Sequence, residues 1–314
     1  MKYYLAPLEG ITGYVYRRAY HEIFYNIDKY FTPFISPTKH NKLTSREKND
    51  VLPEHNKGMY VVPQILTNQA EYFLNTVEKL KEMGYEEVNL NLGCPSKTVV
   101  TKNKGAGFLK EPEVLQQFLE EIFEKSDVKI SIKTRIGMEK AEEFPKLMKI
   151  FNEYPLEELI IHPRVQTDYY NNTPNLEAYR YAQEVATMPL CYNGDIFNID
   201  NFNYYKKQFP EQNCWMLGRG VIGNPALLGQ IIDGKFIEKD KLKLFHDIVY
   251  QGYEEIMSGE KNVLFKMKEL WFYMGNLFED SQKVMKQIKK ATKGAEYKSA
   301  VEQLFQNYEM IGKE

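Results

Sequence analysis

Cysteine is scarce in this chain of 314 residues, and long apolar runs are absent. Its three cysteines, Cys94, Cys191 and Cys214, form no Cys-x-x-Cys pair, which argues against a disulfide framework and against a zinc cluster. No apolar run approaches the ~18 residues of a membrane-spanning helix. The first residues, MKYYLAPLEG, lack the apolar core of roughly 7–15 residues that a signal peptide carries. We therefore expect a cytoplasmic protein with no membrane segment and no metal site.

Net charge is also small, because 41 basic and 43 acidic residues leave a formal charge of -2. This balance argues against indiscriminate nucleic-acid binding but allows a local basic patch. Hydrophobic residues make up 43% of the chain and charged residues 27%, which argues against a disordered protein. The length suits one large domain followed by a smaller one.

Short runs of alternating or apolar residues predict eight strands separated by helical patterns such as residues 68–84 and 111–126. Strand–helix alternation with parallel crossovers predicts an α/β fold, and eight repeats predict a TIM (β/α)8 barrel. The predicted strands are Tyr3–Pro7, Tyr30–Ile35, Tyr60–Ile65, Glu87–Leu92, Lys129–Lys133, Leu159–His162, Leu190–Asn193 and Cys214–Leu217.

After about residue 240 the pattern contains helices only, over residues 241–259, 261–278 and 281–311. We therefore expect two domains, a catalytic barrel over residues 1–235 and a small C-terminal all-helical domain over residues 236–314. Trp271 and the aromatic residues around it fit a helical core better than a base-stacking surface.

Polar or glycine-rich motifs follow most of the predicted strands, and in a TIM barrel those ends converge on one mouth where chemistry is done. LGRGVIGNP places Gly218 and Arg219 after the eighth strand, at the common phosphate position of this barrel. YNGDI, with Asn193, Gly194 and Asp195, supplies the neighbouring half. Two tight turns are the alternative interpretation of these motifs.

Lys133 is expected at the top of the fifth strand, with Arg135 on the same face. A buried and unpaired ammonium is costly, so Lys133 is predicted either beside a cofactor that becomes anionic, such as a reduced flavin, or as a Schiff-base lysine. Gln64 and His162 close the third and sixth strands. For each of these two, a core hydrogen bond and a role at the barrel mouth are equally supported.

Cys94 differs from the other two cysteines because it lies past its strand, between Gly93 and Pro95. Cys191 and Cys214 lie within apolar strands, where we expect small buried side chains. A thiol with a reference pKa near ~8.5 is mostly protonated at neutral pH. Cys94 is therefore a candidate proton donor rather than a nucleophile.

The motifs APLEGIT, NLNLGCPSK, KGAG, IKTR, IHPR, YNGDI and LGRGVIGNP, in this order, closely resemble those of the tRNA-dihydrouridine synthases. The resemblance runs from about residue 3 to 230, and the helical tail resembles that family's C-terminal domain. It implies an FMN enzyme that reduces uridine in tRNA to 5,6-dihydrouridine with NADPH or NADH, and it implies no obligate protein partner. It also makes residues 236–314 a tRNA-binding domain.

The resemblance also implies roles for individual residues. Cys94 would donate the proton. Pro7, Leu8, Glu9, Gln64, Lys133 and His162 would contact the flavin, and Asn193, Gly194, Asp195, Gly218 and Arg219 would hold its ribityl phosphate. Asn91, Arg135 and Arg164 would face the uracil or its backbone. The chain departs from the family at Gln166, where a basic residue is usual, in the following stretch TDYYNNTP, and at the Leu8-Glu9 pair.

Three other functions remain open on the residues alone: an FMN barrel that reduces or oxidises a free pyrimidine such as dihydroorotate or uracil, a Schiff-base lyase using Lys133, and a non-enzymatic RNA-binding barrel. A basic helical run would suit tRNA phosphates, although a solvated helix face is the alternative. Its lysines are Lys283, Lys286, Lys289, Lys290, Lys293 and Lys298. Segment 38–48 and Lys97, Lys102 and Lys104 would extend this basic surface.

Overall fold

The computed structural model describes residues 1–24, 26–40 and 42–311. Asn41 of the predicted basic segment 38–48 and residues 312–314 of the predicted helical domain lie outside the described residues. Among the described residues, no helix combines the length and the apolar character that a membrane crossing requires.

Parallel strands form one sheet with the neighbour order β3-β2-β1-β9-β8-β7-β6-β5-β4. Pro63 separates β3 from β4, because proline has no N–H to donate to a ladder. β3 pairs with β2 and β4 pairs with β5, so this interrupted third strand closes the sheet. The predicted TIM barrel is confirmed. The strands are β1 (Lys2–Leu5), β2 (Lys29–Phe31), β3 (Val61–Val62), β4 (Gln64–Ile65), β5 (Glu87–Leu92), β6 (Lys129–Arg135), β7 (Leu159–His162), β8 (Leu190–Tyr192) and β9 (Cys214–Leu217).

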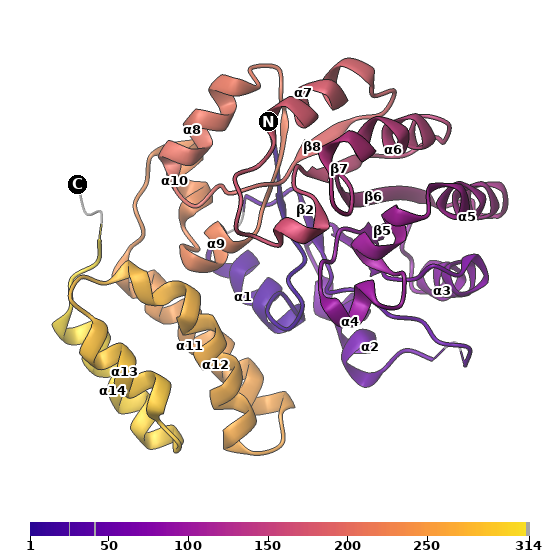
Figure 1. The fold of residues 1–314 in the computed structure, drawn as a ribbon. Coiled ribbons are helices and arrows are strands. Elements are labelled where there is room, and N and C mark those ends of the chain that lie inside the picture. The colour runs from indigo at the N-terminus through magenta and orange to yellow at the C-terminus, as the bar shows by residue number, and fades with distance from the viewer. Residues whose placement is uncertain (25, 41, 312–314) are drawn as a thin grey trace. The chain divides into compact units, whose positions relative to one another are not determined.

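Helices follow most strands and lie outside them, as Figure 1 shows for the helices around β5 to β8. Apolar side chains on one face of each helix, such as Phe73 of α3 and Phe118 of α5, pack together in a T-shaped pair with ring centroids 5.9 Å apart. The helices between the strands are α1 (Tyr14–Ile23), α2 (Ser45–Val51), α3 (Ala70–Glu82), α4 (Lys97–Val100), α5 (Pro112–Lys125), α6 (Phe144–Phe151), α7 (Leu176–Val185) and α8 (Ile199–Gln208).

Several strand predictions need correction. The first strand ends at Leu5 rather than Pro7, and the fifth runs on to Arg135. The second strand ends at Phe31 rather than Ile35, and Ile35 instead forms an isolated bridge with Ile65. The third predicted strand is broken in its middle by Pro63. In the second and third strands, apolar residues continue in the sequence where regular strand pairing has stopped.

The chain divides into two compact units that are discontinuous in sequence. Unit 1 contains residues 1–7, 28–195 and 205–217, and therefore all of the strands. Unit 2 contains residues 8–27, 196–204 and 218–314. Its helices after β9 are α9 (Arg219–Gly223), α10 (Leu227–Asp233), α11 (Lys239–Ile256), α12 (Glu260–Met274), α13 (Gln282–Lys290) and α14 (Gly294–Asn307).

Aromatic packing joins α1 to α11 within unit 2. Phe245 of α11 meets Tyr16 edge-on at 5.4 Å between ring centroids and Phe24 at 5.5 Å. Gly252 of α11 lies against Val15, where an added Cβ would approach a methyl group to 2.7 Å. The segment after β1 is thus part of the helical unit, and its residues are held there by side-chain packing.

The helical tail has a buried aromatic core around Trp271, which is 1% exposed. This confirms the core prediction for Trp271, but Phe272, the next residue, is 79% exposed. Successive residues of a helix point about 100° apart, so a run of aromatic residues cannot all face the core. The predicted helical stretch 281–311 is also two helices, α13 and α14, which lie side by side (Figure 1).

Candidate active site at the carboxyl ends of the strands

Cys94 lies in a turn directly after β5, and hydrogen bonds fix the peptide groups of that turn. The Oδ1 atom of Asn91 accepts from Gly93 N at 3.0 Å and from Cys94 N at 2.9 Å. The carbonyl oxygen of Cys94 accepts from Ala106 N at 3.1 Å. The thiol is therefore carried by a turn whose peptide groups are hydrogen-bonded on both sides of Cys94.

Gly105 explains why a glycine-rich segment must follow the Cys94 turn. Its φ is +56°, and an added Cβ would lie 2.9 Å from the carbonyl oxygen of Cys94. Only glycine adopts this conformation readily and leaves room for so close an approach. The motif KGAG therefore has a packing role that its sequence alone does not indicate.

A chain of amide side chains runs from the Cys94 turn into the barrel. The Nδ2 group of Asn91 donates to Gln64 Oε1 at 2.7 Å, and Gln64 Nε2 donates to Asn89 Oδ1 at 2.8 Å. Asn89 Nδ2 then donates to Ser131 Oγ at 3.0 Å. In this chain the NH2 group of each amide donates to an oxygen of the next side chain, and this pattern fixes the orientation of each carboxamide. Gln64 and Asn91 are brought together, as the shared barrel mouth predicts.

Lys133 lies in the same layer of the barrel, because it is the register partner of Asn91 in the neighbouring strand. Burial lowers the pKa of Lys133 to about 8, and the neighbouring Arg135 adds to this shift, while Cys191 and Cys94 oppose it. Among the described residues no carboxylate forms an ion pair with Lys133. A partly desolvated ammonium without a protein counter-charge fits a ligand that brings negative charge of its own.

Arg135 makes its contacts with backbone carbonyl groups. Its Nε donates to Gly93 O at 3.1 Å, and its two terminal nitrogens donate to Val165 O at 2.8 Å and Tyr169 O at 2.6 Å. Burial lowers the pKa of Arg135. The guanidinium therefore joins the Cys94 turn to the loop that follows β7.

Arg164 and Asp195 form a two-pronged ion pair. Arg164 Nη1 donates to Asp195 Oδ1 at 2.9 Å, and Nη2 contacts Asp195 Oδ2. Arg164 Nη1 also lies 2.9 Å from His162 Nε2, which accepts because a guanidinium can only donate. The structure thus brings His162, Arg164 and Asp195 together, with the charge of Arg164 neutralised by Asp195.

Asn193 and Gly194 follow β8 at the same end of the barrel. Asn193 Nδ2 donates to Met216 O at 2.9 Å, which ties this turn to β9. An added Cβ at Gly194 would lie 3.1 Å from the Tyr192 hydroxyl and 3.3 Å from Pro174. The side chains of Tyr192 and Pro174 therefore pack closely against the backbone of this turn.

Pro7 is half-buried and comes just after β1 in the chain. It is the last residue of that segment of unit 1.

The remaining predicted contacts lie in unit 2. Gly218 and Arg219 begin α9, where Gly220 must be glycine because an added Cβ would lie 1.9 Å from Ile196 O. The Arg219 guanidinium lies over the Phe197 ring at 5.0 Å. Leu8 N donates to Thr12 Oγ1 at 2.8 Å, and the Glu9 side chain is exposed.

One residue of this site, Gln166, is not predicted by the sequence, where it stands out only as a departure from the family. Its Nε2 group donates to Pro95 O at 3.0 Å. Cys191 and Cys214 are buried, as predicted.

The structure as a whole defines a parallel β/α barrel whose polar, glycine-rich and titratable groups gather at the carboxyl ends of the strands, as in barrel enzymes.

Comparison with known proteins identifies the family. A family model described as dihydrouridine synthase (Dus) matches residues 4–309. tRNA-dihydrouridine synthase B of Pasteurella multocida is 26% identical over 242 residues, which cover 77% of this chain and 71% of that protein. tRNA-dihydrouridine(16) synthase of Aquipseudomonas alcaligenes is 27% identical over 239 residues, covering 74% of this chain and 75% of that protein.

A solved structure of morphinone reductase in complex with tetrahydroNAD has a TM-score of 0.52 at 13% identity and covers 78% of this chain and 90% of that one. This likeness shows the barrel fold alone. The family match spans nearly the whole chain, so the chain belongs to the dihydrouridine synthase family and is a flavin-dependent oxidoreductase. The lyase and the non-enzymatic barrel are thereby excluded.

Proposed function

We propose that this protein reduces the C5–C6 double bond of uridines in tRNA, with FMN as its flavin and NADPH or NADH as reductant. The observation that carries the proposal is the placement of the Cys94 turn beside Lys133 and Asn91 at the carboxyl end of the barrel. The names of the relatives support tRNA rather than a free pyrimidine as the substrate.

Bound FMN would supply the hydride that adds to C6 of uracil. Cys94 then donates its thiol proton to C5, where the negative charge has developed, and the hydrogen-bonded turn holds the thiol in place for this transfer. Asn91 acts through that turn. Arg135 and Arg164 shape the substrate pocket by ordering its loops, since their guanidinium groups contact protein oxygens.

The flavin would be held by side chains and N–H groups that follow the carboxyl ends of the strands. Lys133 would place its ammonium near the polar edge of the flavin, where a desolvated cation stabilises negative charge. Gln64 and His162 would contact the same cofactor, together with Pro7, Leu8 and Glu9. The N–H groups of the Asn193-Gly194-Asp195 turn and of Gly218, with the guanidinium of Arg219, would bind the ribityl phosphate.

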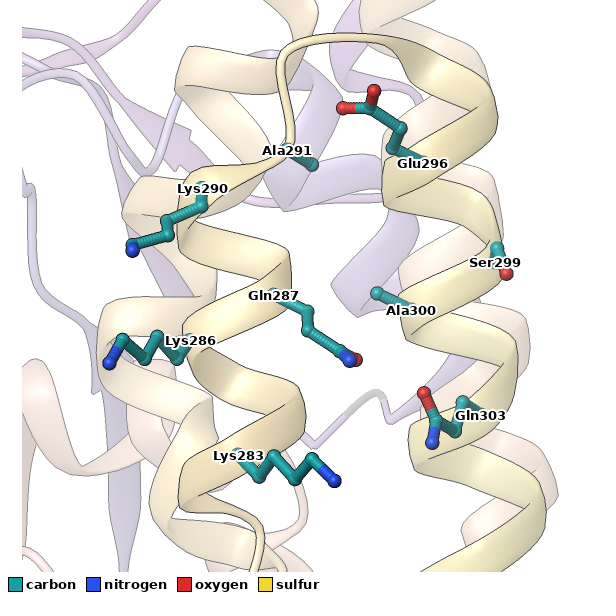
Figure 2. Close-up of a pocket in the computed structure, with 9 residues that line it drawn as sticks. All are labelled: Lys283, Lys286, Gln287, Lys290, Ala291, Glu296, Ser299, Ala300 and Gln303. Atoms are coloured by element: carbon teal, nitrogen blue, oxygen red, sulfur yellow. The ribbon is translucent and has the colours of Figure 1, made fainter.

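We propose residues 1–235 as the FMN-binding catalytic domain and residues 236–314 as the tRNA-binding domain. A groove of about 580 Å³ between α13 and α14 supports the second assignment (Figure 2). Lys283 and Gln287 extend from α13 toward α14, whereas Lys286 and Lys290 extend from the other edge of α13. Lys283 thus places one ammonium at the groove, and Lys286 and Lys290 place two more along the outer edge of α13. With Glu296 as the single carboxylate of the lining, this face of α13 is suitable for phosphates.

Other lysines of the basic run are used differently. Lys298 lies 3.4 Å from Glu254 and over the Tyr250 ring at 4.7 Å, so it is anchored to the protein. Lys289 lies in the last turn of α13, where positive charge also stabilises the helix end, and it does not line the groove. We therefore assign the RNA contact to Lys283, Lys286 and Lys290. The cytoplasmic location remains part of this proposal, since the proposed substrate is tRNA.

The purified protein should be yellow and should convert uridine to dihydrouridine in unmodified tRNA when NADPH or NADH is supplied. Mass spectrometry of nuclease-digested tRNA measures the product and maps its position. A parallel reaction with free uracil and with uridine separates tRNA reduction from the action of a free-pyrimidine oxidoreductase. Product from free uracil at the same rate, with none in tRNA, would contradict the proposal.

A further inference from the structure

We infer that Gln166 is a positioning residue, which holds the Cys94 turn so that the thiol can protonate the substrate. Gln166 is 6% exposed, and its Nε2 group donates to Pro95 O at 3.0 Å across 71 positions of sequence. This hydrogen bond links the loop after β7 to the residue that directly follows Cys94. The inference rests on the proposed role of Cys94 as the proton donor.

The segment that carries Gln166 is itself fixed. Gln166 N donates to Gly137 O at 2.9 Å, and Thr167 N donates to Met138 O at 3.1 Å. On either side of Gln166, the Arg135 guanidinium binds the carbonyl oxygens of Val165 and Tyr169. Because these hydrogen bonds fix the backbone around Gln166, its side chain can hold the carbonyl group of Pro95 in place.

Contacts on both sides of Cys94 show what Gln166 adds. Before the thiol, Asn91 binds the amide groups of Gly93 and Cys94, and Arg135 binds the carbonyl oxygen of Gly93. Beyond it, proline has no N–H, so Pro95 can be anchored only through its carbonyl oxygen. Gln166 provides that anchor. The carbonyl oxygen of Cys94 also accepts from Ala106 N at 3.1 Å, so Gln166 adds a second hydrogen bond beyond the thiol, at the peptide group that proline leaves without a donor.

The chemistry explains why such an anchor matters. Proton transfer from sulfur to carbon needs the thiol within contact distance of C5, and a misplacement of ~1 Å can lower a rate by up to ~10²-fold. The amide of Gln166 provides this anchor without adding a positive charge next to a thiol that must stay protonated.

The test uses the full-length holoenzyme with Gln166→Met, which keeps the length of the side chain but cannot donate. Gln166→Arg restores a donor, and Gln183→Met, at an exposed position of α7, is the matched control. Two rates are compared: reoxidation of the reduced flavin by tRNA in H2O and D2O, and alkylation of Cys94 by iodoacetamide, followed by peptide mass spectrometry. Reduction of the flavin by NADPH serves as the reference step.

We expect Gln166→Met to slow reoxidation by tRNA about tenfold and to raise its solvent isotope effect, with NADPH reduction unchanged. Alkylation of Cys94 should be severalfold faster, Gln166→Arg should restore part of the reoxidation rate, and Gln183→Met should match the wild type. Unchanged reoxidation in Gln166→Met overturns the inference, and so does unchanged alkylation. A wild type that makes no dihydrouridine refutes the proposed function instead, and alkylation then still tests the anchor.

Discussion

Asn91 and Cys94 are joined by a short, directed contact, in which the Cys94 amide donates to Asn91 Oδ1 at 2.9 Å. The other end of the Asn91 carboxamide donates to Gln64, which fixes its orientation. An acid that must deliver one proton to one carbon benefits from such a fixed support, because the geometry is set before the substrate binds. The barrel interior thus determines where the thiol lies.

The charge of Lys133 should contribute to the upper pH limit of activity. Burial lowers the pKa of Lys133 to about 8 in the protein without its flavin. Loss of this proton and of the Cys94 thiol proton should together lower kcat/KM at alkaline pH. Lys133→Arg should keep activity to higher pH, because arginine stays protonated. Lys133→Met should be slow at every pH. Lys129→Arg, at the exposed start of the same strand, is the control, and an identical alkaline limb in wild type and Lys133→Arg would contradict this role.

Asp195→Asn should destabilise the protein by about 3 kcal/mol, because it leaves the guanidinium of Arg164 buried without its counter-charge. Arg164 is 1% exposed and Asp195 20%. Urea denaturation at constant m-value measures the change. The control is Asp127→Asn, which breaks an exposed ion pair with Lys81 and should cost less than about 1 kcal/mol. An equal loss of unfolding free energy in the two variants would show that the Arg164–Asp195 pair stabilises the protein no more than an exposed ion pair does.

Tyr297→Phe should destabilise the helical unit by about 2–3 kcal/mol, since it leaves two buried partners unsatisfied. The Tyr297 hydroxyl accepts from Trp271 Nε1 at 2.8 Å and lies 2.7 Å from His246 Nε2, to which it donates. Burial lowers the pKa of His246, in keeping with a neutral ring that accepts this proton. Tyr308→Phe, in the same unit, is the control for loss of a hydroxyl. Equal unfolding temperatures for the two variants would show that the hydrogen bonds of Tyr297 with Trp271 and His246 do not stabilise this unit.

Replacing Lys283, Lys286 and Lys290 with alanine should weaken tRNA binding and flatten its salt dependence. Removal of each ammonium that binds a phosphate should reduce the slope of log Kd against log salt by roughly 0.7–0.9. Filter binding at several salt concentrations gives that slope. A matched triple replacement of Lys81, Lys125 and Lys146, which pair with carboxylates in unit 1, removes the same charge elsewhere. If both triple variants change the slope equally, then Lys283, Lys286 and Lys290 do not form a specific tRNA-binding surface.

The strands and the barrel could be predicted from sequence because burial on both sides leaves a local signature of short apolar runs between turn residues. The position of Cys94, Lys133 and His162 at one mouth followed from their places at strand ends. What the sequence could not reveal is where a long side chain finds its partners. Alternation places Arg135 on the same face as Lys133, and the structure shows that its guanidinium binds three carbonyl oxygens that come from loops.

Long-range packing accounts for the other differences. Nothing in the local pattern of residues 8–27 indicates that α1 packs against α11 through Tyr16 and Phe245, because that contact joins segments more than two hundred positions apart. Gln166 had no local signal either, since its role depends on a partner in the turn after β5. In the sequence, Gln166 stands out only because the family usually has a basic residue at this position.

The most direct test of the account is single-turnover reoxidation of the reduced holoenzyme by tRNA, compared between the wild type and Cys94→Ala. Removal of the proton donor should slow this step by about 10²-fold or more, while the variant keeps its flavin, its reduction by NADPH and its affinity for tRNA. Reoxidation of Cys94→Ala at the wild-type rate, with normal dihydrouridine formation, would contradict the central claim that this thiol protonates the substrate.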